Sequence, residues 1–262
     1  MAARELGTLL VGPGKGPRAL GLARSLVMYY GQPWRTAALG RLYRGFLEPG
    51  DLAFDIGAHV GNRARLWSRL GARVIAVEPQ PDFAAWLRWQ FRRDPRVTVL
   101  EQAVAATPGM AKLHLSARTP TVSTLSTDWI ARLRTDQSFA GVDWAAPVEV
   151  PATTLDGLIG EFGLPRFCKV DVEGFEAEVL RGLSQPLPAL SLEYVPAAVG
   201  VALAAIGRLD ELGRYRFNIA PGERMRWLWP GWRGRREVED WLALRRPGEL
   251  SGDVYARLEE RR

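Results

Sequence analysis

The sequence is poor in cysteine and histidine and has no long hydrophobic run. Cys168 is its one cysteine, which excludes an intramolecular disulfide and a cysteine-based zinc cluster and fits a reducing compartment. The longest apolar segment, residues 195–206, is shorter than the roughly 20 residues that a membrane-spanning helix needs. No secretory signal is recognisable near the N-terminus. We therefore expect a cytoplasmic protein without a membrane span.

Lysine is also scarce, although the chain is basic. The formal net charge is +6, from 35 basic and 29 acidic residues, and only Lys15, Lys112 and Lys169 are lysines. Basic residues are interleaved with acidic ones, and no run of five or more like charges occurs. Proteins that bind nucleic acids instead gather basic residues in runs or on one face. The charge pattern therefore argues against a nucleic acid as partner.

The rest of the composition is that of an ordinary globular protein, with 47% hydrophobic and 24% charged residues over 262 positions. These values exclude wholesale disorder, a collagen-like chain and a coiled coil. Residues 1–50 carry apolar side chains at helical intervals and predict an N-terminal helical extension. From residue 51 to residue 262, short apolar runs alternate with amphipathic segments. We predict an α/β fold with a doubly wound, mostly parallel, Rossmann-like sheet.

This alternation also predicts the individual elements. Strands are expected at residues 52–56, 73–77, 97–102, 167–172, 190–194 and 215–219, and helices at residues 61–70, 81–92, 175–182 and 199–212. Residues 108–147 break the pattern and predict a hairpin and loop inserted over one end of the sheet, where specificity loops usually lie. Within this insertion, residues 116–128 are the candidate recognition segment. Residues 224–262 are rich in Trp and Arg and predict a last helix around Trp241.

The first predicted strand ends in an acid that two glycines follow, in Asp55-Ile-Gly-Ala-His-Val-Gly61. The glycines let a ligand approach the backbone at the carboxyl end of the strand. Their spacing is not the Gly-x-Gly-x-x-Gly of a dinucleotide fingerprint, and Asp55 would repel a pyrophosphate. The pattern therefore argues against a nicotinamide-dependent oxidoreductase and favours a ligand that carries an ammonium group or another positive charge.

The next two strands bring polar groups to the same edge of the sheet. Glu78, followed by Pro79, ends the second strand, where a carboxylate can accept both hydroxyls of a ribose. Gln102 and Ala103 follow the third strand, where an amide can meet an adenine edge and a methyl group can pack on its face. Together these residues predict a nucleoside site.

Four short blocks in order resemble the FkbM family of S-adenosylmethionine-dependent methyltransferases, a class I, Rossmann-like family. The blocks lie within residues 50–196 and are Asp55-Ile-Gly-Ala-His-Val-Gly61, Glu78-Pro79, Thr154-Leu-Asp156 and Lys169-Val-Asp-Val-Glu-Gly174. Each block is weak alone, but four at these spacings are specific. The chain departs from the family pattern at His59, a position commonly Asn, and at Arg63-Ala64, where a small hydroxyl residue often follows the second glycine.

The resemblance implies a binding site for the cofactor S-adenosylmethionine and its product S-adenosylhomocysteine. The implied cofactor-binding residues are Asp55, Gly57, Ala58, His59, Gly61, Glu78, Pro79, Gln102 and Ala103. Those of the first block would border the methionine part of the cofactor, Glu78 the ribose, and Gln102 with Ala103 the adenine.

Asp171, Glu173 and Glu193 are the candidate catalytic residues, at the predicted carboxyl ends of two neighbouring strands. A hydroxyl acceptor must lose a proton on methylation, and one of these acids can act as the general base. Asp171 and Glu193 are alternatively oxygen ligands for Mg²⁺, but two acids alone do not establish a metal site. We therefore assign no metal ligand.

The resemblance implies O-methylation of a hydroxyl on a sugar, a glycolipid or polysaccharide component, or a secondary metabolite. N- or carboxyl-methylation would keep the cofactor site and change the acceptor, and a nucleoside-binding module without catalysis is the alternative from another class. Trp227, Trp229 and Trp232 provide either a platform for a ring-bearing acceptor or core and dimer contacts. Whether the chain forms a homo-oligomer stays open.

Overall fold

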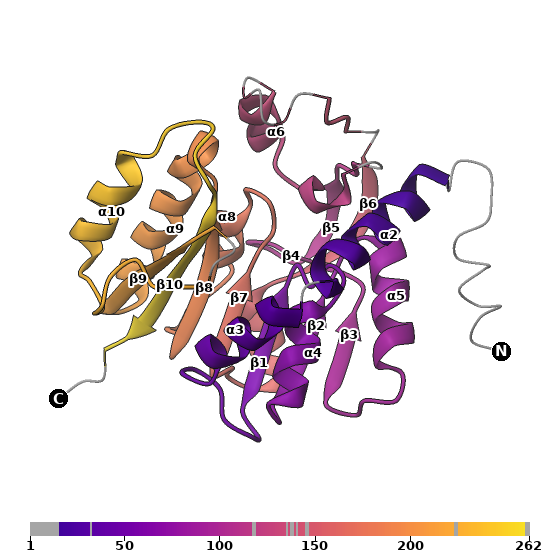
Figure 1. The fold of residues 1–262 in the computed structure, drawn as a ribbon, viewed down its shortest axis with the longest axis horizontal. Coiled ribbons are helices and arrows are strands. Elements are labelled where there is room, and N and C mark those ends of the chain that lie inside the picture. Colours follow the sequence, from indigo (N-terminus) through magenta and orange to yellow (C-terminus); the bar gives the residue numbers. More distant parts are fainter. Residues whose placement is uncertain are drawn as a thin grey trace.

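The computed structural model describes residues 16–31, 33–116, 119–134, 136, 139, 141–144, 147–222 and 225–259. Its centre is a seven-stranded sheet with the strand order β3-β2-β1-β7-β8-β10-β9 (Figure 1). The strands are β1 (Leu52–Ile56), β2 (Arg73–Val77), β3 (Val97–Leu100), β7 (Phe167–Val170), β8 (Ala189–Tyr194), β9 (Tyr215–Pro221) and β10 (Gly252–Leu258). Five neighbouring strands are parallel, and β10 is antiparallel to both of its neighbours. The predicted mostly parallel sheet is confirmed.

Helices cover both faces of the sheet (Figure 1). One apolar cluster packs α3 (Pro33–Tyr43), α4 (Asn62–Arg69) and α5 (Pro81–Phe91) on one face. A second cluster packs α7 (Leu155–Phe162), α8 (Glu176–Arg181), α9 (Val199–Leu212) and α10 (Arg235–Ala243) on the other. Successive side chains of a strand point to opposite faces, so Ala53 joins the first cluster, and Phe54 and Ile56 join the second. The fold is therefore doubly wound.

The strands that follow β1 in the sequence lie on both sides of it in the sheet. β2 and β3 are added on one side of β1, and β7 and β8 on the other. In the register of β1 with β7, Asp55 lies opposite Lys169, and the Asp171 N–H donates to the Ile56 carbonyl at 3.0 Å. Ligands of open α/β sheets bind at such a switch point, outside the carboxyl ends of the strands. The topology thus places the first and fourth sequence blocks side by side.

A small second sheet, with the order β4-β6-β5, carries the predicted insertion. It comprises β4 (Ala103–Val104), β5 (Gly109–Leu113) and β6 (Val148–Thr153), and the pair β5–β6 is antiparallel, as a hairpin requires. Between these two strands lies α6 (Thr127–Leu133), which contacts residues 196–198 just beyond the carboxyl end of β8. The insertion therefore reaches the edge of the main sheet where the switch point lies.

Several element boundaries differ from the predictions. The strand expected at 97–102 ends at Leu100, because Ala103 and Val104 leave it to pair with β6. The strand expected at 167–172 ends at Val170. Helices α6 and α7 and strands β6 and β10 were not predicted. Strand β10 was not predicted because Asp253 and Arg257 interrupt its apolar residues, although the strand is buried between β8 and β9.

The N-terminal helix α2 (Gly16–Tyr30) lies outside the sheet, against the loop after β1 and against α5. The expectation of no secretory signal concerns residues 1–15, which lie outside the described residues. None of the helices in the described ranges combines the length and the hydropathy that crossing a bilayer requires.

Candidate functional site

A pocket opens at the carboxyl ends of β1, β2 and β7. All but one of the predicted cofactor-binding residues line it, namely Asp55, Gly57, Ala58, His59, Glu78, Pro79, Gln102 and Ala103. Gly61 does not line it. The fold therefore gathers residues from the first two sequence blocks and from the end of the third strand around one space.

The two glycines of the first block are required for different structural reasons. Gly57 has φ +81°, and a Cβ there would lie 1.8 Å from the Asp171 carbonyl oxygen, so the turn crosses directly over the end of β7. Gly61 has φ +76°, and its Cβ would lie 2.5 Å from Leu87 Cδ2 of α5. Gly61 is thus required for packing α4 against α5, whereas Gly57 shapes the floor of the pocket.

Glu78 and Asp55 are carboxyl groups that are each only 2% exposed and that face this pocket. Glu78 Oε2 accepts from the His59 N–H at 2.8 Å, and Oε1 accepts from the Gln80 N–H at 2.9 Å. Burial raises the pKa of Glu78 to about 7 against these two hydrogen bonds, and burial raises the pKa of Asp55 to about 6. Each Glu78 oxygen keeps acceptor capacity after one such bond.

His59 is a buried, neutral member of the pocket wall. Its φ is +51°, and its ring stacks on Phe83 at 4.3 Å and meets the edge of Tyr29 at 5.4 Å. Burial lowers the pKa of His59 to about 4, and its Nε2 is buried with no hydrogen-bond partner among the described residues. The ring is thus held by aromatic contacts, and its lowered pKa keeps it uncharged near neutral pH.

Lys169 is buried between two acids from different strands. Its Nζ lies 2.6 Å from Asp171 Oδ2 and 3.6 Å from Asp253 Oδ1, and the side chain is 1% exposed. Burial alone would raise the pKa of Asp171, but the charges of Lys169 and Arg63 hold it below its usual value. Asp171 is thus an ionised, fixed carboxylate at the mouth of the pocket. Sequence reasoning missed Asp253, because it lies in the unpredicted strand β10.

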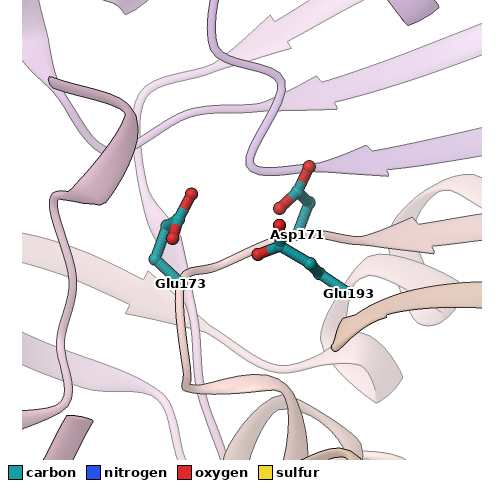
Figure 2. Close-up of side chains that lie close together, drawn as sticks. All are labelled: Asp171, Glu173 and Glu193. Atoms are coloured by element: carbon teal, nitrogen blue, oxygen red, sulfur yellow. The ribbon is translucent and has the colours of Figure 1, made fainter. Parts of the chain in front are cut away.

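The three candidate catalytic acids converge at the end of β7 and β8 (Figure 2). Carboxylate oxygens of Asp171, Glu173 and Glu193 all lie within 4.8 Å of one another. Glu173 lines the pocket, whereas the Glu193 Oε2 is buried without a hydrogen-bond partner among the described residues. Burial and the neighbouring carboxylates raise the pKa of Glu173 and of Glu193 well above the usual range. Such a cluster can share a proton or coordinate a divalent cation.

The predicted recognition segment also reaches the pocket. The Thr124 hydroxyl donates to the Glu173 carbonyl at 2.6 Å, and the Ser123 hydroxyl donates to Gln80 Oε1 at 3.1 Å. Thr121 and Leu125 line the same space. The insertion therefore forms the wall next to the acids.

The aromatic residues near the C-terminus lie elsewhere. Trp227 packs its ring edge against Tyr255 at 4.9 Å, and Trp232 contacts Phe46 at 6.1 Å. Among the described residues, neither these two nor Trp229 lines the pocket at the switch point. Trp227 is 37% exposed, whereas Trp229 and Trp232 are half-buried and pack against the two apolar clusters.

The wall residues that were not predicted for the cofactor site include Arg63 of α4 and Tyr29 of α2. An Arg in the first turn of a helix does not by itself indicate a binding residue. The one sequence signal at this position was the departure from the family pattern at Arg63-Ala64. Tyr29 belongs to the helix that was predicted as part of a separate N-terminal extension. The sequence pattern of that helix does not show which part of the domain it contacts.

Comparison with known proteins identifies the family. Residues 55–194, more than half of the chain, match the profile of the Methyltransferase FkbM domain. The chain belongs to the FkbM methyltransferase family. The resemblance drawn from the four sequence blocks is thus confirmed, and this FkbM methyltransferase uses S-adenosylmethionine as methyl donor.

Other matches to this FkbM methyltransferase are more distant. Hexuronic acid methyltransferase AglP of Haloferax volcanii is 27% identical over 188 residues, which cover 68% of this chain and 72% of AglP. Precorrin-6y C5,15-methyltransferase of Geobacter metallireducens matches in structure with a TM-score of 0.46 and 14% identity, over 87% of this chain and 88% of that one. The C-terminal domain of the Rhodobacter capsulatus enzyme matches with a TM-score of 0.38 and 14% identity, over 83% and 86%. At these TM-scores neither structural likeness bears on the function.

Proposed function

We propose that this FkbM methyltransferase methylates a hydroxyl group of a sugar, either free or within a glycolipid or polysaccharide. The observation that carries the proposal is the cluster of Asp171, Glu173 and Glu193 beside the pocket. A hydroxyl acceptor has to lose a proton, which one of these acids can take up, whereas a carboxylate acceptor has no proton to lose. The name of the relative AglP, a hexuronic acid methyltransferase, supports a sugar acceptor.

The residues around the pocket fit the methyl donor. Glu78 can accept from the two ribose hydroxyls, because each of its oxygens accepts one backbone hydrogen bond and keeps further acceptor capacity. Asp55 can face the ammonium group of the methionine part, and Gln102 and Ala103 can border the adenine. The donor, when bound, supplies a methyl group on a sulfonium sulfur, which becomes a neutral thioether as the acceptor oxygen bonds to the methyl carbon.

Glu173 is the best placed of the three acids to take the hydroxyl proton. Glu173 lines the pocket, and burial and the neighbouring carboxylates raise its pKa, which makes its carboxylate a stronger base. Asp171 is a weaker base, because Lys169 and Arg63 lower its pKa. Glu193 lies next to Glu173, its Oε2 is buried, and its raised pKa favours the protonated form. In this scheme Glu173 receives the proton as the new carbon–oxygen bond forms.

The test is transfer of a labelled methyl group from S-adenosylmethionine to a panel of neutral sugars, uronic acids and amino sugars. We expect a product whose added methyl group resists mild alkali, as an ether does, whereas an alkali-labile methyl ester would show carboxyl methylation. Glu173→Gln should lose about 100- to 10,000-fold in turnover. Glu161→Gln, an exposed acid on α7, is the matched control and should retain activity.

Two other results would contradict this assignment. Full turnover of Glu173→Gln with an identified acceptor would exclude Glu173 as the base. Turnover that is lost in a chelator and restored by Mg²⁺ would make Asp171, Glu173 and Glu193 metal ligands in place of proton acceptors.

A further inference from the structure

Arg63, the second residue of α4, is a nearly buried cation with an incomplete set of partners. Its side chain is 13% exposed and lines the pocket. The nearest carboxylate oxygen, Asp253 Oδ2, lies 3.9 Å from Nη2, which is too far for a hydrogen bond. The Arg63 Nε is buried and has no hydrogen-bond partner within the described part of the chain. Leaving a charged donor buried and unpaired is costly, so this arrangement points to an anion that Arg63 meets when the pocket is filled.

Arg63 is also the one cationic side chain among the described residues that line the pocket. Lys169 does not line it and already neutralises Asp171 and Asp253. His59 is neutral, because burial lowers its pKa to about 4. The acids that line the pocket are Asp55, Glu78, Asp171 and Glu173.

The methionine part of the donor carries three charges, a sulfonium, an α-ammonium and an α-carboxylate. The acids of the pocket can meet the two positive charges, but the carboxylate needs a cation. We infer that Arg63 binds this α-carboxylate, while Asp55, whose Oδ2 accepts from the Ala64 N–H at 3.1 Å, faces the ammonium. Arginine suits the task, because its planar guanidinium can donate two parallel hydrogen bonds to one carboxylate.

The position of Arg63 on α4 strengthens the same interaction. Gly61 is the N-cap of this helix, so Arg63 lies in its first turn, where unpaired backbone N–H groups and the helix dipole favour an anion. The inference rests on the proposed donor site, because it names the partner of one group of that donor. Arg63 is one of the positions at which this chain departs from the family pattern, and the inference gives that departure a direct role in binding the donor.

Three ligands separate the carboxylate from the rest of the donor. S-adenosylhomocysteine carries both amino-acid groups, its decarboxylated analogue keeps the ammonium only, and 5′-methylthioadenosine lacks both. Calorimetric titrations of the intact chain would compare wild type with Arg63→Met and Arg63→Lys. Arg65→Met is the matched control, because Arg65 is an exposed residue of the same helix and does not line this pocket.

We expect the wild type to prefer S-adenosylhomocysteine over its decarboxylated analogue by about 10- to 100-fold, the usual worth of a charged hydrogen bond. Arg63→Met should lose this preference and bind 5′-methylthioadenosine as the wild type does, which also shows that the pocket is intact. Arg63→Lys should keep part of the preference, and Arg65→Met all of it.

The inference and the proposed function fail in different ways. A full carboxylate preference in Arg63→Met, or equal loss of all three ligands in that variant, would overturn the role given to Arg63. Absence of binding of all three ligands to the well-folded wild type would instead overturn the donor site itself.

Discussion

Glu78 is a buried carboxyl whose pKa, about 7, lies well above the usual value because of burial. Ribose hydroxyls donate hydrogen bonds to the ionised form, so the donor should bind to the carboxylate and not to the acid. We predict that the affinity for S-adenosylhomocysteine is constant at high pH and falls up to tenfold per pH unit as the pH drops below about 7. Calorimetric titrations between pH 5.5 and pH 8.5 measure this dependence.

The matched variant for this titration is Glu78→Gln. It should bind more weakly at high pH and lose the step near pH 7, keeping only a lower step from Asp55, whose pKa is about 6. A wild-type affinity that does not change between pH 6 and pH 8 would contradict the role of Glu78.

Lys169 is a positioning residue, because it holds Asp171 through a 2.6 Å ion pair. Its Nζ also pairs with Asp253 of β10 at 3.6 Å. Lys169→Met leaves two acids next to each other without their cation. We predict a loss of about 3 to 5 kcal/mol in the free energy of unfolding, as for other broken buried pairs. The pKa of Asp171 should rise, and so should that of Glu173, the proposed base, because the Lys169 charge lowers both, so the pH–rate profile should shift to higher pH.

Chemical unfolding and the pH profile of turnover test Lys169 together, since a purely structural role would leave the profile in place. Lys112→Met, an exposed lysine of β5, is the control and should change neither measurement. An unshifted profile in Lys169→Met would remove Lys169 from the site.

At the scale of elements, the turn after β7 and the insertion depend on each other. Gly174 has φ +85°, and a Cβ there would lie 2.0 Å from Trp129 Cδ1 of α6. We predict that Gly174→Ala displaces α6 or the turn that carries Glu173, and lowers both the melting temperature and turnover. Differential scanning calorimetry and the methyl-transfer assay measure the two effects.

Gly160→Ala is the matched control for this substitution. Gly160 lies within α7, and a Cβ there would have no neighbouring atom within 4 Å, so alanine should be neutral or stabilise by up to about 1 kcal/mol. Equal stability of Gly174→Ala and Gly160→Ala would contradict the proposed contact between the turn and the insertion.

The elements next to the site could be predicted because their signals are local. β1 and β2 have the expected bounds, since each is a short apolar run that ends in an acid or Pro-containing turn. β10 and its Asp253 could not be predicted, because a strand that pairs between β8 and β9 is defined by long-range contacts. The second sheet could not be predicted either, because β4 has only two residues and forms by pairing with the distant strand β6.

At the scale of the whole molecule, segments far apart in the sequence close around the same pocket. α2 contributes Tyr29, and its Tyr30 hydroxyl donates to the Val60 carbonyl at 2.9 Å. The insertion adds Thr121 and Leu125 from a much later part of the chain. This arrangement explains why the residues of the core blocks were predictable as one site, whereas its outer walls were not.

We predict that the donor couples these outer segments. Binding of S-adenosylhomocysteine should slow amide hydrogen exchange in α2 and in residues 119–126, because both contact the pocket. α10 is the internal control, since it packs on the other face of the sheet and contributes no residue to the pocket. Protection of α10 alone, or of none of these segments at saturating ligand, would contradict the predicted coupling of the outer segments by the donor.

The central claim is that the pocket at the switch point holds the methyl donor. Titration of the purified chain with S-adenosylhomocysteine, with NAD as the control ligand and Glu78→Ala as the control protein, tests it most directly. The account predicts micromolar binding, about −8 kcal/mol, that is lost in Glu78→Ala, and no heat with NAD. Absence of heat from S-adenosylhomocysteine with well-folded wild-type protein, or equal affinity in Glu78→Ala, would contradict it.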